Sequence, residues 1–83
     1  MTLQEREIII RPSITKSDFR IEGLSRNCTI EIIDQNGKLV FQKIVNGDVG
    51  TNCDISNLPS GLYYISILNT ENKLRRIRRI VKM

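Results

Sequence analysis

The sequence predicts an all-β domain: a small antiparallel β-sandwich of the immunoglobulin-like kind with about six to seven short strands. Two observations support this class. Short runs alternate apolar and polar residues, and turn-forming residues separate these runs at intervals of roughly ten residues. The composition, with 40% hydrophobic and 27% charged residues, is that of a folded domain. We therefore expect residues 1–83 to form a single domain, with residues 1–6 as a flexible lead-in.

The first two expected strands lie near the N-terminus. Residues 8–10 are three isoleucines, and the run ends at Pro12, which lacks an amide N–H and biases its predecessor toward extended geometry. Such a proline suits an edge strand that leaves a sheet. Residues 19–22 alternate apolar with charged side chains and stop at Gly23. We expect an edge strand and a second short strand here.

The clearest hairpin signal follows. Residues 28–32 alternate, and an Asn-Gly pair ending at Gly37 tolerates positive φ, so the chain turns tightly into residues 38–42. Residues 46–50 are again turn material, and residues 51–55 are expected to begin a further short strand or extended segment. This spacing of short strands is typical of a sandwich.

The segment DISNLPSG immediately precedes the aromatic and β-branched run LYYISIL. Pro59 fixes its own φ, and Gly61 can adopt a backbone conformation closed to other residues. In the following run Tyr63, Ile65 and Ile67 share one face, so a slip of one residue would exchange the buried and exposed sets. We expect this turn to set the register of a central strand.

The last eleven residues carry six of the thirteen positive charges, and no acidic residue follows Glu71. Their apolar positions, at 74, 77, 80 and 81, have the spacing of a basic amphipathic helix. A final strand paired with residues 63–68 fits the sandwich better, and we favour it. A solvated strand face is the commonest use of such charge, although a basic segment also suits an acidic or anionic partner.

Catalysis and metal binding find no support in the residue types. The chain has no histidine, no paired-carboxylate motif and no CxxC spacing, so we expect no catalytic residue, no metal site, no cofactor and no enzymatic activity. Cys28 and Cys53 are either one disulfide or two buried free thiols, and we favour free thiols. We also expect no transmembrane segment and no secretory signal peptide within this chain.

Four segments in order, IRPSITKSDFRIEGL, CTIEIIDQNGKLVFQ, DISNLPSGLYYISIL and KLRRIRRIVKM, resemble the type A C-terminal sorting domain of the type IX secretion system, the Por secretion family. The resemblance runs from about Ile8 to Met83. Its most specific part is LPSGLY, at residues 58–63, which is similar to the family's leucine-proline-x-glycine-hydrophobic-tyrosine block. The hairpin through Gly37 and the closing strand with Lys82 also match. The family's Pro-Asn-Pro block is reduced to Pro12 followed by Ser and Ile.

The resemblance implies a non-enzymatic secretion signal at the end of a larger exported protein of Bacteroidota. It implies recognition by the outer-membrane translocon, removal by a surface sortase that joins the cargo to an anionic lipopolysaccharide, and a final location in the medium or on the outer-membrane surface after passage through the periplasm. We accordingly expect a monomeric C-terminal fragment that lacks its cargo domain and signal peptide. The residues assigned to recognition are Gly37, Leu58, Pro59, Gly61, Tyr63, Arg78, Arg79 and Lys82. We expect Arg78, Arg79 and Lys82 to add exposed positive charge to the last strand.

Two other functions compete with this one. A small adhesion or glycan-binding module would use Tyr63 and Tyr64 as a stacking surface, but four aromatic residues make a poor platform. A nucleic-acid binder would use the basic tail, which contains no aromatic residue for base stacking. We therefore expect no nucleic-acid partner.

Overall fold

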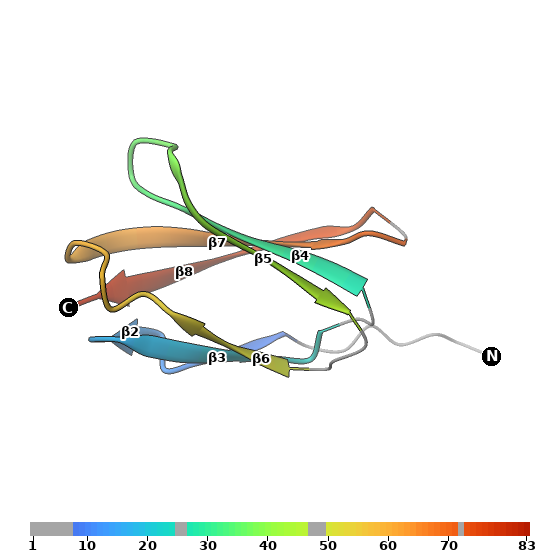
Figure 1. Cartoon of the computed structure of the whole chain (residues 1–83), viewed down its shortest axis with the longest axis horizontal. Coiled ribbons are helices and arrows are strands. Elements are labelled where there is room, and N and C mark those ends of the chain that lie inside the picture. Colours follow the sequence, from blue (N-terminus) through green and yellow to red (C-terminus); the bar gives the residue numbers. More distant parts are fainter. Residues whose placement is uncertain (1–7, 25–26, 47–49, 72) are drawn as a thin grey trace.

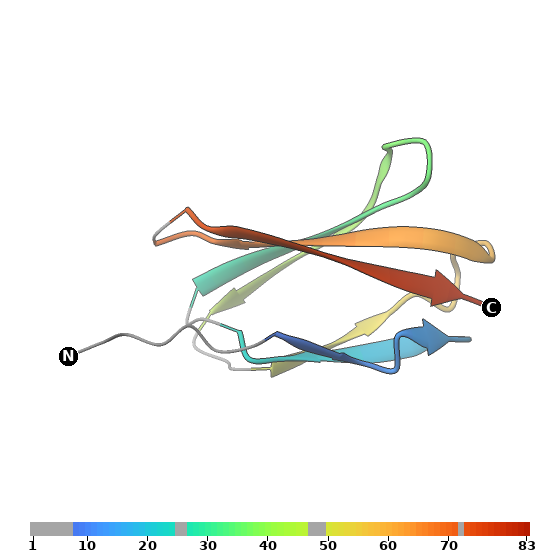
Figure 2. The ribbon, with the colours of Figure 1, turned by 180° about the vertical axis from the view of Figure 1, so that it is seen from behind.

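A computed structural model describes residues 8–24, 27–46, 50–71 and 73–83, and these residues form two β-sheets packed face to face without a helix (Figures 1 and 2). The predicted all-β sandwich is confirmed. The described residues form eight strands rather than the expected six to seven: β1 (Ile9–Arg11), β2 (Ile14–Thr15), β3 (Asp18–Glu22), β4 (Asn27–Ile33), β5 (Leu39–Asn46), β6 (Gly50–Asp54), β7 (Gly61–Asn69) and β8 (Arg75–Lys82). The expected lead-in, residues 1–6, lies outside the described residues.

The smaller sheet has the order β1-β3-β6, and both of its pairings are antiparallel. β1 is an edge strand that ends just before Pro12, as the sequence predicts. β3 buries Phe19 and Ile21 at alternate positions and is followed by Gly23, which has a φ of +83°. Only a residue without Cβ takes this conformation readily, so the strand stops there.

The larger sheet has the order β2-β8-β7-β4-β5. β7 lies between β8 and β4, which confirms the central strand expected after the LPSG segment. β8 pairs with β7 as an antiparallel hairpin, so the helical alternative for the tail is wrong. The sandwich decides this, because a last strand satisfies its backbone hydrogen bonds along β7 while Ile80 enters the core.

One pairing departs from the expected antiparallel sandwich. β2 runs parallel to β8, with Ile14 opposite Val81 and Thr15 opposite Lys82. The amide of Val81 donates to the carbonyl of Ser13 at 2.9 Å, and that of Met83 to Thr15 at 2.8 Å. The chain leaves β1 in one sheet and joins the edge of the other within a few residues. A two-residue strand of this kind has no alternation for a sequence pattern to reveal.

The core lies between the facing surfaces of the two sheets. Burial of each large apolar side chain contributes roughly 1.5–3 kcal/mol. The buried residues come from both sheets and the segments that join them: Phe19, Ile21, Leu24, Cys28, Ile30, Ile32, Val45, Cys53, Ile55, Tyr63, Ile65, Ile67 and Ile80.

Candidate functional site

The turn that leads into β7 is closed by local hydrogen bonds. The amide of Leu58 donates to the carbonyl of Ile55 at 3.0 Å, and the amide of Ser56 donates to Oδ1 of Asp54 at 2.9 Å. The Ser56 backbone amide and then its side chain hold the pKa of Asp54 below its usual value, because both favour the ionised carboxylate. Leu58 is half-buried against the core. The turn is therefore anchored both by polar contacts and by packing.

Tyr63 ties this turn to the strand that follows it. Its side chain is buried, and its hydroxyl donates to the carbonyl of Pro59 at 2.6 Å. Gly61 has a φ of +151°, and a Cβ at that position would lie 3.1 Å from Nε2 of Gln35. Both the backbone conformation and the neighbouring side chain thus favour glycine. Sequence reasoning singled out Tyr63 for its place in the motif but missed its hydrogen bond back to the turn.

Gly37 sits in the turn between β4 and β5. Its amide donates to the carbonyl of Asp34 at 3.0 Å, and the amide of Asp34 donates to Lys38 at 2.9 Å. Oδ1 of Asp34 accepts from the amides of Asn36 and Lys38. Gly37 takes a φ of +83°, and the strand register shifts just before this turn, as in hairpins that end in a bulge.

The two turns and the end of the last strand lie together. Gly61 pairs with Lys82 across the β7–β8 ladder, and the side chain of Gln35 reaches Gly61 from the other turn. We call this end of the molecule the turn cluster: residues 34–38, 55–61 and 80–83. Figure 1 shows these segments at the end that also carries the C-terminus. The turn cluster brings together five of the assigned residues from three separate segments: Gly37, Leu58, Pro59, Gly61 and Lys82.

The three assigned basic residues of β8 differ in their surroundings. Lys82 is only 8% exposed, and its Nζ donates to the carbonyl of Met83 at 3.3 Å. The expectation that Lys82 adds exposed charge is therefore wrong, because this residue occupies an inward-facing position at the packed end of β8. Arg78 is half-buried, and its guanidinium donates to the carbonyl of Ile77 at 3.0 Å. Arg79 is exposed.

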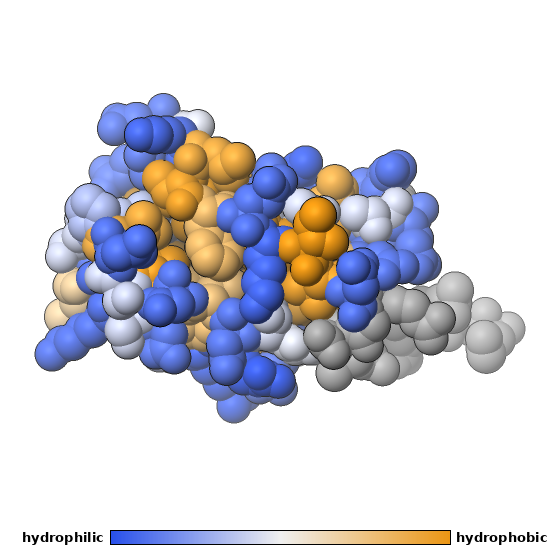
Figure 3. Space-filling view, in the orientation of Figure 1, coloured by the Kyte–Doolittle hydropathy of each residue, from blue (hydrophilic) through white to orange (hydrophobic). Residues whose placement is uncertain are grey.

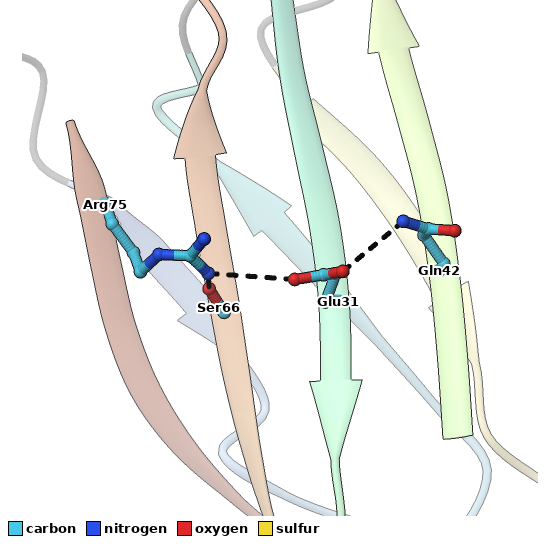
Figure 4. A network of polar contacts seen from close by, with 4 residues as sticks. All are labelled: Glu31, Gln42, Ser66 and Arg75. Atoms are coloured by element: carbon cyan, nitrogen blue, oxygen red, sulfur yellow. Dashed lines mark hydrogen bonds and ion pairs between the residues drawn. The ribbon is translucent and has the colours of Figure 1, made fainter. Parts of the chain in front are cut away.

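A polar network crosses the outward face of the larger sheet (Figure 4). The guanidinium of Arg75 hydrogen-bonds the hydroxyl of Ser66 and lies 3.6 Å from Oε1 of Glu31. Gln42 extends the chain by donating to the other carboxylate oxygen of Glu31 at 3.3 Å. Ser66 is buried although it faces outward. No sequence pattern indicates this network, because its four members come from four different strands.

Apolar side chains also reach the surface of the larger sheet. Tyr64 is 37% exposed, and Ile77 is 56% exposed. They line an open groove of about 550 Å³ together with Ser13, Ile14, Leu62, Arg78, Arg79 and Val81. The side that Figure 3 shows carries separate apolar patches with hydrophilic side chains between them. On β5, Leu39 and Ile44 are exposed. The lining of the groove combines apolar and arginine side chains.

The two neighbouring tyrosines do not form a common stacking surface. Tyr63 is buried while Tyr64 faces the opposite side of β7, so the two rings do not share a surface.

Cys28 and Cys53 are buried and unbridged in the structure. Burial raises the pKa of Cys53 to about 11 against the opposing effect of the Lys43 charge. This thiol is therefore protonated near neutral pH and a poor nucleophile.

Within the described residues, no helix is long and apolar enough to cross a membrane. No group of three or more His, Cys, Asp or Glu side chains in the same part of the chain could hold a metal ion.

Comparisons with known proteins address the family and the fold of this chain. A family described as "Secretion system C-terminal sorting domain" matches residues 10–83. A search of curated proteins finds no match. A chain from a structural study of PorZ, described as an essential bacterial surface component of the type-IX secretion system of Porphyromonas gingivalis, superposes with a TM-score of 0.71 at 20% identity.

That superposition covers 92% of this chain and 11% of the PorZ chain, and at this identity it shows a shared fold. The family match carries the assignment, because it spans nearly every strand described here. It confirms the resemblance seen in the sequence, and the family is one of sorting signals rather than enzymes. The chain belongs to the C-terminal sorting domain family of the type IX secretion system.

Proposed function

We propose that this domain directs an attached N-terminal cargo protein through the type IX outer-membrane translocon, and that the translocon reads the turn cluster and the adjoining last strand. Family membership implies a sorting signal and export to the cell surface or the medium. The observation that carries the finer proposal is the convergence of the motif residues. Segments distant in sequence meet where Gly61 faces Lys82 and Gln35 reaches Gly61.

The direction of β1 supports this assignment. Arg11, at the end of β1, lies opposite Arg20, and Asp18 of the same strand β3 lies opposite Asp54. Asp54 is the residue before the turn that leads into β7, so β1 runs toward the turn cluster. A cargo domain joined ahead of β1 approaches from the other end, and the turn cluster stays accessible to a partner.

The proposal includes three further points, on oligomeric state, route and cleavage. The domain acts as a monomer, it passes through the periplasm before it meets the translocon, and a cell-surface sortase cuts at or before Ile8. The cut would leave the sandwich intact, because Ile8 precedes the first strand. No residue of this chain acts as a catalyst in the scheme.

The test is an export assay. Residues 1–83 are fused behind a signal peptide and a fluorescent cargo in a bacterium that carries the type IX system. The intact fusion should deliver cargo to the surface or the medium, and a fusion that ends at Arg79 should accumulate in the periplasm. Retention of the intact fusion would refute the proposal.

A second pair of fusions separates recognition from folding, because the truncation also removes the fully buried Ile80. Ser60→Arg adds a large side chain at an exposed position of the turn cluster, and Asn46→Arg adds one at an exposed position at the far end of β5. We expect Ser60→Arg to reduce export and Asn46→Arg to leave it unchanged. Equal export of both would remove the turn cluster from the recognition surface.

A further inference from the structure

One edge of the larger sheet is only partly covered. β2 lies beside β8 only at Val81 and Lys82, and no other described strand lies on that side of β8. We call residues 75–79 the open half of β8 and residues 80–82 the held half. Along the open half, one row of backbone groups has no neighbouring strand among the described residues. Such an edge is a template for the addition of another strand.

The orientation of the backbone along this edge follows from the hydrogen bonds of β2. The amides of Val81 and Met83 point toward β2, and alternate residues of a strand point the same way. The amides of Ile77 and Arg79 therefore face the open edge. The carbonyl of Ile77 accepts a hydrogen bond from the Arg78 guanidinium of the same strand, in the place of a bond from a neighbouring strand.

The groove described above lies along this edge. Its lining joins the end of β2, through Ser13 and Ile14, to Ile77 and Arg79 of the open half. β2 already shows that an extended segment fits there, since its two residues pair with β8 in register. A longer strand placed in line with β2 would set one side chain beside Ile77 on the outward face.

The charges at this edge select the partner. Arg79 and Arg78 have no carboxylate within salt-bridge distance among the described residues, whereas Glu31 is already paired with Arg75. No acidic residue follows Glu71 in the sequence. Positive charge concentrated beside a strand edge favours an acidic partner and steers its approach.

From this geometry we propose that the open half of β8 takes up an extended acidic segment of a partner protein as an added β-strand. The segment places an apolar side chain beside Ile77 and acidic side chains beside Arg78 and Arg79. The inference rests on the proposed sorting function and specifies the chemistry of the partner. It assigns affinity to the backbone of the open half and selectivity to the two arginines.

The first experiment uses residues 1–83 and a defined probe, a short synthetic peptide with valine and threonine flanking a Glu-Glu pair. Amide hydrogen exchange is followed by NMR. With the peptide at about ten times its Kd, exchange at the Ile77 and Arg79 amides should slow by roughly tenfold. A matched peptide with Gln-Gln in place of Glu-Glu should bind about tenfold more weakly. Equal protection of the Ile77 and Arg79 amides by the two peptides would overturn the proposal of an acidic partner.

Three variants locate the binding. Ile77→Pro removes an edge-facing amide at a position where an edge strand tolerates proline, and it should abolish binding of the Glu-Glu peptide. Arg79→Glu should weaken binding by about tenfold or more, because attraction becomes repulsion. Arg20→Glu, which makes the same charge change at an exposed position of β3 in the smaller sheet, should bind like the unaltered chain. Far-ultraviolet circular dichroism checks that each variant is folded.

Two outcomes would overturn the proposal in distinguishable ways. If the intact fusion exports its cargo and Ile77→Pro and Arg79→Glu export equally well, the sorting function stands and the added strand is wrong. If sedimentation shows a dimer that Ile77→Pro dissociates, the edge pairs with a second copy of this chain instead of an acidic partner. Retention of the intact fusion rejects the sorting function, while the peptide measurements still decide whether the edge binds acidic strands.

Discussion

The two halves of β8 have similar residues and different neighbours. The held half lies between β7 and β2, with Ile80 fully buried and Lys82 nearly so. Among the described strands, the open half pairs with β7 alone, and its Ile77 and Arg79 are exposed. A basic residue near the C-terminus is therefore not by itself a surface charge. Its position relative to β2 and the facing sheet decides whether it serves the fold or remains available to a partner.

The largest expected effect separates the halves by truncating one isoleucine in each. Ile80→Ala leaves a cavity in the core and should lower the free energy of unfolding by about 2–5 kcal/mol. Ile77→Ala removes an exposed side chain and should change it by less than about 0.5 kcal/mol. Urea denaturation measures both. Equal losses would contradict the division of β8.

The next effect concerns Gly61, which pairs with Lys82 of the held half. Gly61→Val places a β-branched residue at a φ of +151° and should lower stability by about 1–3 kcal/mol. Thermal melts measure the loss. Combining it with Gln35→Ala removes the side chain that the new Cβ would meet, so the loss that persists is backbone strain. A melt that overlays that of the unaltered chain would show that Gly61 does not fix the turn.

A smaller effect tests the bond between the turn and β7. Tyr63→Phe keeps the buried ring opposite Ile80 but removes the hydroxyl that donates to Pro59. The free energy of unfolding should fall by about 0.5–1.5 kcal/mol. Tyr64→Phe, the same change at the exposed neighbour, is the control and should have no measurable effect. Equal free energies of unfolding for the two variants in chemical denaturation would show that the hydrogen bond from Tyr63 to Pro59 does not stabilise the turn.

The smallest effect is expected in the open half. Arg75 is exposed, and Arg75→Met should lower stability by at most about 1 kcal/mol through loss of its contacts with Ser66 and Glu31. The difference should shrink in about 1 M salt, because exposed ion pairs are screened. Arg79→Met should leave stability unchanged at either salt concentration. A larger loss for Arg79→Met would mean that the open half is held by contacts of that side chain.

Local sequence determined much of this protein. Alternation identified β3 and β4, Pro12 marked the end of an edge strand, and the segment before Gly61 identified β7 as central. These features depend on neighbours in the chain: a glycine that permits positive φ, a proline without an amide, or a side-chain period of two. The LPSGLY segment also carried the most specific part of the resemblance to the family, and the family match over residues 10–83 includes it.

Tertiary structure alone decided the parallel pairing of β2, the burial of Lys82 and the network from Arg75 to Gln42. Each depends on segments distant in sequence that meet only after the sheets have formed. The tail shows the reason most directly. Arginines occupy both faces of β8, so the residue types along this strand do not alternate clearly. Only Ile80 and Lys82, at one end of the strand, are buried, and the open half is partly uncovered. Burial is a property of the assembled sheets, and the order of residues along one strand does not contain it.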